Sequence, residues 1–170
     1  MSIADIEIRR LARENEADVA HFRDIRLEAL RVNSEAFGST FETENAQTSS
    51  WFSDRLGTTT VLGAFSDTKL VAMAGFAIQQ GQKRAHKGLL WGMYVLPGAR
   101  GTGVGRRLIE AVLDLARQRV ELIQLTVVQD NEQARRLYAN LGFLDYGLEK
   151  HSLKQDGRYY DEELMVLELA

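Results

Sequence analysis

The sequence predicts one α/β domain with a mixed, mostly antiparallel sheet of about seven strands and about four flanking helices. Segments in which apolar residues alternate with polar ones, as in half-buried strands, occur along much of the chain. Segments with apolar residues three and four positions apart, as in amphipathic helices, lie between them. No segment resembles a linker or an internal repeat, so residues 1–170 are expected to form a single domain.

The composition is typical of a soluble globular protein and argues against several functional classes. The net charge is −3, so the basic surface of a nucleic-acid-binding protein is not expected. No apolar run approaches the roughly 20 residues of a membrane helix, and the first residues lack the basic and apolar regions of a signal peptide. The chain has no cysteine, which removes thiolate nucleophiles and thiolate metal ligands. We therefore expect a cytoplasmic protein with no nucleic-acid or membrane partner.

The first elements of the chain are predicted to be a strand and a long helix. Ile6 and Ile8 alternate with charged residues, which indicates a strand over about residues 5–12. Residues 14–32 have apolar side chains at helical spacing, which predicts an amphipathic helix. The charged residues between these apolar positions are expected to face solvent, and they are Arg23, Asp24, Arg26, Glu28 and Arg31.

Residues 33–42 are predicted to break this helix, and two interpretations of the segment stay open. Phe37 and Phe41 flank a Gly-Ser-Thr sequence, which suits a tight turn pinned by the two rings. The same segment, with the carboxylate of Glu42, also suits a loop that lines a substrate pocket, because binding residues concentrate on loops. A shorter helix is expected over about residues 45–56, with its apolar side chains on one side.

Three successive antiparallel strands are predicted next. Residues 58–65 and 69–78 form two of them. The third contains residues 89–96 and ends at Pro97, because a proline cannot donate a hydrogen bond to a neighbouring strand. His86 lies in the polar turn before this strand, where a lone histidine is more often plain surface than a catalyst.

A glycine-rich loop follows Pro97. Four glycines fall within eight residues, and an apolar helical pattern over about residues 108–116 comes directly after them. Backbone N–H groups are unpaired at the start of a helix, where the helix dipole also favours anions. The glycines are Gly98, Gly101, Gly103 and Gly105, and the nearby arginines are Arg100, Arg106 and Arg107. The loop is therefore predicted to cradle a diphosphate.

Two common phosphate-binding loops do not match this spacing. A dinucleotide loop needs Gly-x-Gly-x-x-Gly, whereas Gly105 is followed here by two arginines. A P-loop closes with Gly-Lys-Ser/Thr, and no lysine lies between residues 88 and 149. What remains is Arg-x-x-Gly-x-Gly, formed by Arg100, Gly103 and Gly105.

A strand over residues 121–129 and a second helix over residues 130–143 are predicted after the loop helix. The strand should be parallel to the one before the glycine loop, because a helix connects the two. Asp130 with Gln133 fits a capping box at the start of the second helix, and Gly142 suits its C-terminal end.

The last two strands are predicted over residues 143–153 and 159–169. The dipeptide Asp156-Gly157 between them is a strong signal for a hairpin turn. Residues 159–163 are either an ordinary exposed start of the last strand or a part of a binding site.

The glycine loop resembles the coenzyme A pyrophosphate loop of the GCN5-related N-acetyltransferases, the GNAT superfamily. The second helix supports this resemblance, because Asn-x-x-Ala-x-x-x-Tyr-x-x-x-Gly-Phe is similar to the other cofactor motif of the family. The residues of that motif are Asn131, Ala134, Tyr138, Gly142 and Phe143. The two motifs span residues 89–143 in the order of the family, and the elements on either side also match its usual order.

The resemblance implies a cofactor site at a splay between the fourth and fifth strands. In the family, the pantetheine arm of acetyl-CoA enters such a splay, here near Met93, Tyr94 and Val95. The pyrophosphate then lies over the glycine loop, and no metal takes part. The other residues implied to contact acetyl-CoA are Arg100, Gly101, Thr102, Gly103, Val104, Gly105, Arg106, Asn131, Ala134 and Tyr138.

The same resemblance implies an N-acetyltransferase, which moves acetyl from acetyl-CoA to a primary amine. Since no cysteine can hold an acyl group, direct attack in a ternary complex is expected. The acceptor is then a small-molecule amine or the N-terminal or lysine amine of a protein, and a homodimer is compatible with this reading. Two alternatives are a non-catalytic acyl-CoA-binding sensor of the same fold and an interaction domain whose glycine loop is merely structural.

Tyr138 is the expected general acid. A phenol with a pKa of about 10 is a proton donor at neutral pH, and a departing thiolate needs a proton. A packed core tyrosine on the same helical face as Leu137 and Leu141 is the other reading of the sequence. The resemblance favours the catalytic role, because a tyrosine at this point is commonly the general acid in the family.

The general base is less well indicated. Many relatives have a glutamate on the strand before the glycine loop, and this chain has none between residues 87 and 96. The candidates are Glu42, Asp161 and His86, in that order. The acceptor site is expected to include Phe37, Glu42, Tyr160 and Asp161.

Overall fold

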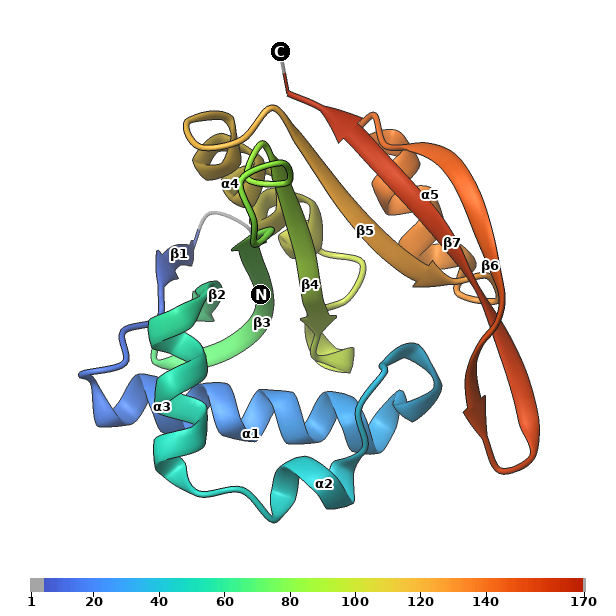
Figure 1. The fold of residues 1–170 in the computed structure, drawn as a ribbon. Helices are drawn as coiled ribbons and strands as arrows, with labels where there is room; N and C mark the ends of the chain where they lie inside the picture. Colours follow the sequence, from blue (N-terminus) through green and yellow to red (C-terminus); the bar gives the residue numbers. More distant parts are fainter. Residues whose placement is uncertain (1–4, 170) are drawn as a thin grey trace.

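The computed structural model describes residues 5–169, which form a seven-stranded sheet with helices on both faces (Figure 1). The strand order is β1-β2-β3-β4-β5-β7-β6, and all neighbouring strands are antiparallel except β4 and β5. The strands are β1 Ile6–Arg10, β2 Thr60–Ser66, β3 Lys69–Ile78, β4 Lys87–Val95, β5 Leu122–Val128, β6 Leu144–Gln155 and β7 Arg158–Glu168. The mixed, mostly antiparallel sheet predicted from the sequence is confirmed.

The helices are α1 Glu16–Val32, α2 Phe41–Asn45, α3 Ser49–Thr58, α4 Val104–Arg117 and α5 Glu132–Asn140, with 3-10 turns η2 Ser34–Ala36 and η3 Pro97–Ala99. Helix α2 was not predicted, because the sequence analysis interpreted residues 33–42 as a break and began the next helix at about residue 45. Thr40 caps α2 by accepting the Thr43 N–H at 3.2 Å, and Thr48 caps α3 in the same way. None of the helices between residues 5 and 169 is long and apolar enough to cross a bilayer.

The start of α5 differs by one residue from the prediction. The side chain of Asn131 accepts the Ala134 N–H at 3.2 Å, so Asn131 is the N-terminal cap and Asp130 is not. Gly142 follows the helix with a φ of 97°, in the left-handed region that favours glycine. The predicted end of this helix is therefore correct.

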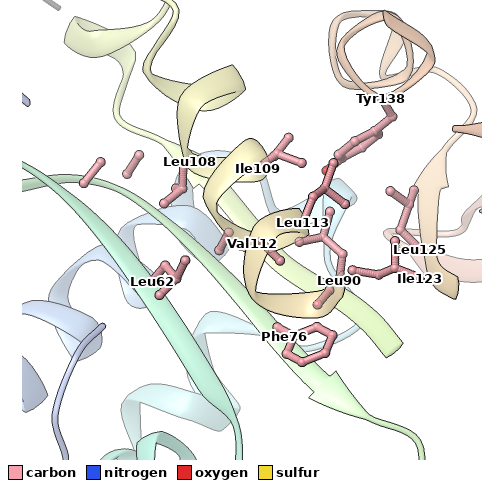
Figure 2. Packing of buried hydrophobic residues seen from close by; sticks show 14 of the residues in the cluster. Leu62, Phe76, Leu90, Leu108, Ile109, Val112, Leu113, Ile123, Leu125 and Tyr138 are labelled. Carbon is pink, nitrogen blue, oxygen red and sulfur yellow. The ribbon is translucent and has the colours of Figure 1, made fainter. Parts of the chain in front are cut away.

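The sheet separates two hydrophobic cores. Helices α1 and α3 cover one face through residues such as Phe22 and Phe52, and we call it the α1/α3 face. Helices α4 and α5 cover the other, the α4/α5 face. Successive strand residues point to opposite faces, so Val61 belongs to the first core and Leu62 to the second. Figure 2 shows the second core, with the α4 residues Leu108, Ile109, Val112 and Leu113 beside Leu62, Phe76 and Leu90.

Strands β4 and β5 are paired only over their first residues. Residues 87–89 pair with residues 122–124, and the two strands then continue to Val95 and Val128 without pairing to each other. The two strands diverge in Figure 1, which confirms the predicted splay between the fourth and fifth strands. The edge of residues 90–95 that faces β5 therefore has backbone groups without a strand partner.

A β-bulge lies in β4 at the splay. Trp91 and Tyr94 pair with β3 residues that are only two positions apart, so Gly92 and Met93 together oppose one residue. Gly92 has a φ of 62°, which glycine adopts without strain. Because of the bulge, Trp91 and Tyr94 both pack on the α1/α3 face.

The prediction that Arg26 faces solvent is wrong. Its side chain is 7% exposed, and its Nε and Nη2 donate to the two carboxylate oxygens of Glu44 at 2.9 and 2.8 Å. Arg26 is four residues from Phe22 and four from Leu30, so it lies on the buried face of α1. Arg31 on the same helix is exposed as predicted.

Candidate active site

A cavity of about 520 Å³ lies in the splay between β4 and β5. Its walls come from α1, η2, β4, the glycine loop, β5, α5 and β7. Tyr94, one of its lining residues, belongs to the core of the α1/α3 face, whereas Val104 and Tyr138 belong to that of the α4/α5 face. The cavity therefore reaches both faces of the sheet.

The structure brings the predicted cofactor residues together around this cavity, with one exception. Thr102 does not line it, and its hydroxyl donates to the carbonyl of Ala99 at 2.6 Å, which holds the loop in shape. The predicted residues that line the cavity are Met93, Tyr94, Val95, Arg100, Gly101, Gly103, Val104, Gly105, Arg106, Asn131, Ala134 and Tyr138.

The glycine loop presents the N-terminus of α4 to the cavity. Gly103 is the N-terminal cap, has a φ of 85° and forms no side-chain cap. The Arg107 N–H donates to the Gly103 carbonyl at 3.1 Å. The N–H groups of the residues before Arg107 precede the first complete helical turn, so they have no acceptor within the helix. A Cβ at Gly105 would lie 3.2 Å from Met93 and 3.3 Å from Val95, so glycine allows α4 to approach β4 closely. This arrangement suits an anion held by backbone N–H groups.

Two arginines of the loop, Arg100 and Arg106, form hydrogen bonds and an ion pair within the protein. Arg100 donates from Nε to the carbonyl of Val95 at 3.0 Å and from Nη2 to Asn33 at 3.1 Å. Arg106 forms an ion pair with Glu110 at 2.9 Å. Their charge adds to the positive potential of the helix N-terminus, while the backbone offers the free donors.

Tyr138 lines the cavity from α5 and is almost completely buried. Its ring lies edge-on to Phe143, with 5.8 Å between the ring centroids. Figure 2 shows the ring extending from α5 toward Ile109 and Leu113 of α4. Burial raises the pKa of the Tyr138 hydroxyl well above its ordinary value, so the phenol is protonated at neutral pH. The side chain is thus a packed core residue whose protonated phenol lies at the cavity wall.

Of the predicted acceptor residues, only Phe37 lines the cavity. Glu42 is exposed on α2, and the carboxylate of Asp161 accepts the His151 N–H at 2.8 Å. Tyr160 packs against Arg158 instead.

The third base candidate, His86, lies in the turn before β4. The His86 carbonyl accepts the Glu121 N–H at 2.8 Å, which places His86 at the end of the sheet where β4 and β5 are still paired. Between residues 5 and 169, no group of three or more His, Asp or Glu side chains could hold a metal ion.

Glu162 is a cavity residue that the sequence analysis missed. Glu163 forms an ion pair with Arg135 of α5 at 2.6 Å, and the alternation of β7 turns Glu162 to the opposite face. The Ser152 hydroxyl donates to its carboxylate at 2.5 Å. The alternating pattern of this strand was visible in the sequence, whereas its phase relative to the cavity was not.

Arg26 and Trp91 are two further cavity residues that were missed. Arg26 is paired with Glu44. Burial raises the pKa of the Glu44 carboxyl, but its hydrogen bonds and the charge of Arg26 outweigh burial and leave the pKa below its ordinary value. The guanidinium of Arg55 lies near the rings of Trp51 and Trp91, at 4.8 and 5.0 Å from their centroids. The spacing of Arg26 from its apolar neighbours on α1 was a signal that could have shown its burial.

The fold and sequence are similar to those of known acetyltransferases. The sequence model described as Acetyltransferase (GNAT) family matches residues 22–143. A GNAT-family acetyltransferase of Streptococcus pneumoniae superimposes with a TM-score of 0.84, at 21% identity over 96% of this chain and 99% of that one. The protein yncA of Salmonella typhimurium, solved with its cofactor acetyl-CoA, gives a TM-score of 0.80 at 22% identity over 97% of this chain and 94% of that one.

Two curated relatives match over shorter segments. A phosphinothricin N-acetyltransferase of Streptomyces coelicolor is 36% identical over 70 residues, which are 41% of this chain and 41% of that protein. The N-alpha-acetyltransferase RimI of Mycobacterium tuberculosis is 34% identical over 96 residues, 56% of this chain and 59% of that protein. The chain thus spans less than two thirds of the length of either relative. Since the family model covers more than half of the chain, the protein belongs to the acetyltransferase (GNAT) family.

Proposed function

We propose that the protein transfers an acetyl group from acetyl-CoA to a primary amine, by direct attack of the amine in a ternary complex. One observation supports this best: a single cavity contains the N-terminus of α4, the unpaired edge of β4 and the protonated Tyr138. These three features suit a diphosphate, an extended amide arm and a leaving group that needs a proton.

We infer the position of acetyl-CoA from these features. Its pyrophosphate accepts hydrogen bonds from the N–H groups at residues 103–106, where the dipole of α4 also favours negative charge. Its pantetheine amides pair with the free β4 backbone near Met93 and Val95, as an added strand does. The similar fold of the Salmonella protein, which was solved with acetyl-CoA, supports this placement.

In the reaction, the amine nitrogen forms a bond to the thioester carbonyl carbon, and the carbon–sulfur bond breaks. The Tyr138 hydroxyl donates its proton to the departing sulfur, and the second proton, which the nitrogen releases as the amide forms, passes through solvent and restores the phenol. Because burial raises the pKa of this phenol, the proton is in place at neutral pH. Before the attack, an acceptor amine with a pKa near the lysine value of about 10.4 must lose a proton.

We propose Glu162 as the group that takes up this proton. Its side chain lines the cavity from β7, and the hydroxyl of Ser152 holds its carboxylate in place. Glu42 is exposed on α2 and does not line the cavity. Its role as the general base stays a prediction, which a matched substitution tests.

Two acceptor classes belong to this proposal. One relative is named for the small molecule phosphinothricin, and another for N-alpha acetylation. A small-molecule amine and a protein N-terminal amine should therefore both be assayed, together with a lysine-containing peptide.

Two measurements test the proposed function. Thermal unfolding is followed with and without acetyl-CoA, because a ligand at 100 times its dissociation constant stabilises the folded state by about 2.7 kcal/mol. Absence of a shift would leave an interaction domain with a structural glycine loop. Release of free thiol from acetyl-CoA is then measured with a panel of amines. Binding without thiol release from any amine would identify a non-catalytic acyl-CoA sensor.

A further inference from the structure

On the α1/α3 face, the cavity is lined by residues whose hydrogen-bond donors lack acceptors. Arg26 uses Nε and Nη2 to bind Glu44, and no described residue accepts a hydrogen bond from its Nη1. The indole N–H of Trp91 is buried and also lacks a partner among residues 5–169. Buried donors without acceptors cost free energy, so this part of the cavity suits a ligand that accepts hydrogen bonds.

The free nitrogen of Arg26 lies beside the bulge of β4. A Cβ built on Gly92 would be 3.7 Å from Nη1, and both residues line the cavity. The unpaired edge of β4 begins at this point, and that edge is the proposed position of the pantetheine arm. A group bound at Nη1 would therefore lie close to the reacting end of the cofactor.

The charges around this part of the cavity are unequal. Arg26 and Glu44 compensate each other, while Arg55 adds a second cation near the ring of Trp91 at 5.0 Å. Burial and the nearby charge of Arg26 lower the pKa of Arg55, and the charge of Glu44 opposes them in part. Phe37 closes this side of the cavity, with its ring 5.3 Å from the Arg26 guanidinium carbon. An anion near the free Arg26 nitrogen would be attracted by both guanidinium groups.

We infer that Arg26 binds an oxyanion of the acceptor, so that the acceptor is an amine that also carries a carboxylate. This inference rests on the proposed function, because it names the acceptor class for the same cavity. A carboxylate accepts charge-assisted hydrogen bonds from a guanidinium and compensates the charge of Arg55. Glu162, in the same cavity, suits the ammonium group of such an acceptor. The cofactor phosphates are a poor match, because their proposed site at α4 is on the opposite face of the sheet.

The binding test uses the whole chain saturated with coenzyme A, which allows binding to be measured without turnover. The ligands are the common α-amino acids and β-alanine, each compared with its carboxamide, which keeps the amine and removes the negative charge. We expect at least one acid to bind about 10- to 100-fold more tightly than its carboxamide, as for a hydrogen bond between charged groups. Equal affinities for every acid and its amide, or no binding by any acid, overturn the inference.

Substitutions then assign the preference to Arg26. Arg26→Gln alone would leave the carboxylate of Glu44 buried and unpaired, so the informative variant is the double Arg26→Gln, Glu44→Gln. It should bind coenzyme A as the wild type does and lose the preference for acids. Arg31→Gln, at an exposed position on the same helix, is the matched control and should keep it. A double variant that keeps the wild-type preference shows that Arg26 is not the anchor.

Turnover distinguishes this inference from the proposed function. If neutral amines release thiol from acetyl-CoA as fast as amino acids do, acetyl transfer stands and the role of Arg26 is overturned. If no amine releases thiol, the proposed function fails. Acid-selective binding that depends on Arg26 in the titration would even then support an anion site.

Discussion

Arg26 of α1 and Glu44 of α2 form a buried ion pair with two hydrogen bonds, Nε to Oε2 at 2.9 Å and Nη2 to Oε1 at 2.8 Å. Their side chains are 7% and 2% exposed. The pair joins α2 to α1 beside the cavity, so it holds the wall that contains the free Arg26 nitrogen. It also makes the stability of the protein sensitive to the loss of either partner.

Glu44→Ala is expected to destabilise the protein by about 3–5 kcal/mol, because the charge of Arg26 then stays buried without its partner. Urea unfolding of both proteins measures the difference. Glu42→Ala is the matched control, since Glu42 is exposed on the same short helix and should change stability by less than about 0.5 kcal/mol. Similar small losses in both variants would mean that the ion pair contributes little.

The same pair predicts a loss of stability in acid. Burial raises the pKa of Glu44, but the hydrogen bonds and charge of Arg26 have the larger effect and bring it below its ordinary value. Because the folded-state pKa is below an unfolded value of about 4.3, this stabilisation is complete above that pH and is lost as the pH falls through the folded pKa. The stability difference between wild type and Glu44→Ala should therefore shrink below about pH 4. A difference that grows towards low pH contradicts this assignment.

Gly103→Val should weaken acetyl-CoA binding by more than about tenfold, because a β-branched residue is strained at the φ of 85° and its side chain crowds the cradle. Calorimetric titration of a variant shown to be folded by circular dichroism measures the affinity. Gly98→Ala is the control, since a Cβ at Gly98 meets nothing within 4 Å and Gly98 does not line the cavity. Unchanged affinity in folded Gly103→Val would show that the loop is not the cofactor cradle.

Tyr138→Phe should keep acetyl-CoA affinity and lose turnover by about 10²-fold, the low end for a general acid, because a thiolate is a tolerable leaving group. Packing against Phe143 is retained, so stability should change little. Since burial raises the pKa of Tyr138, the wild-type rate should show no loss of this proton below about pH 10. Single-turnover rates across pH measure both effects. Wild-type turnover in the variant would leave Tyr138 as a core residue and water as the proton source.

Glu162→Gln should lower kcat/KM by about 10²- to 10⁴-fold if this carboxylate removes the proton of the amine. Glu42→Gln and Asp161→Asn are matched controls that each remove one carboxylate outside the lining of the cavity, and both should stay near the wild-type rate. A large loss in Glu42→Gln with normal activity in Glu162→Gln would instead support Glu42 as the base.

Local sequence determined most of the elements and the proposed cofactor half of the cavity. Pro97 ends β4 because it lacks an N–H, and Gly103 permits the left-handed turn that starts α4. Gly142 follows α5 in the left-handed conformation that glycine favours. These effects act over a few residues, so they are visible in the sequence.

Only the tertiary structure decided which charged residues face the cavity. Arg26 is buried because α2 brings Glu44, 18 residues later, against α1. Glu162 faces the cavity and Glu163 faces α5 because of the register with which β7 pairs to β5. The physical reason is that local sequence sets backbone conformation through sterics and short-range hydrogen bonds, whereas burial of a charge depends on partners far along the chain.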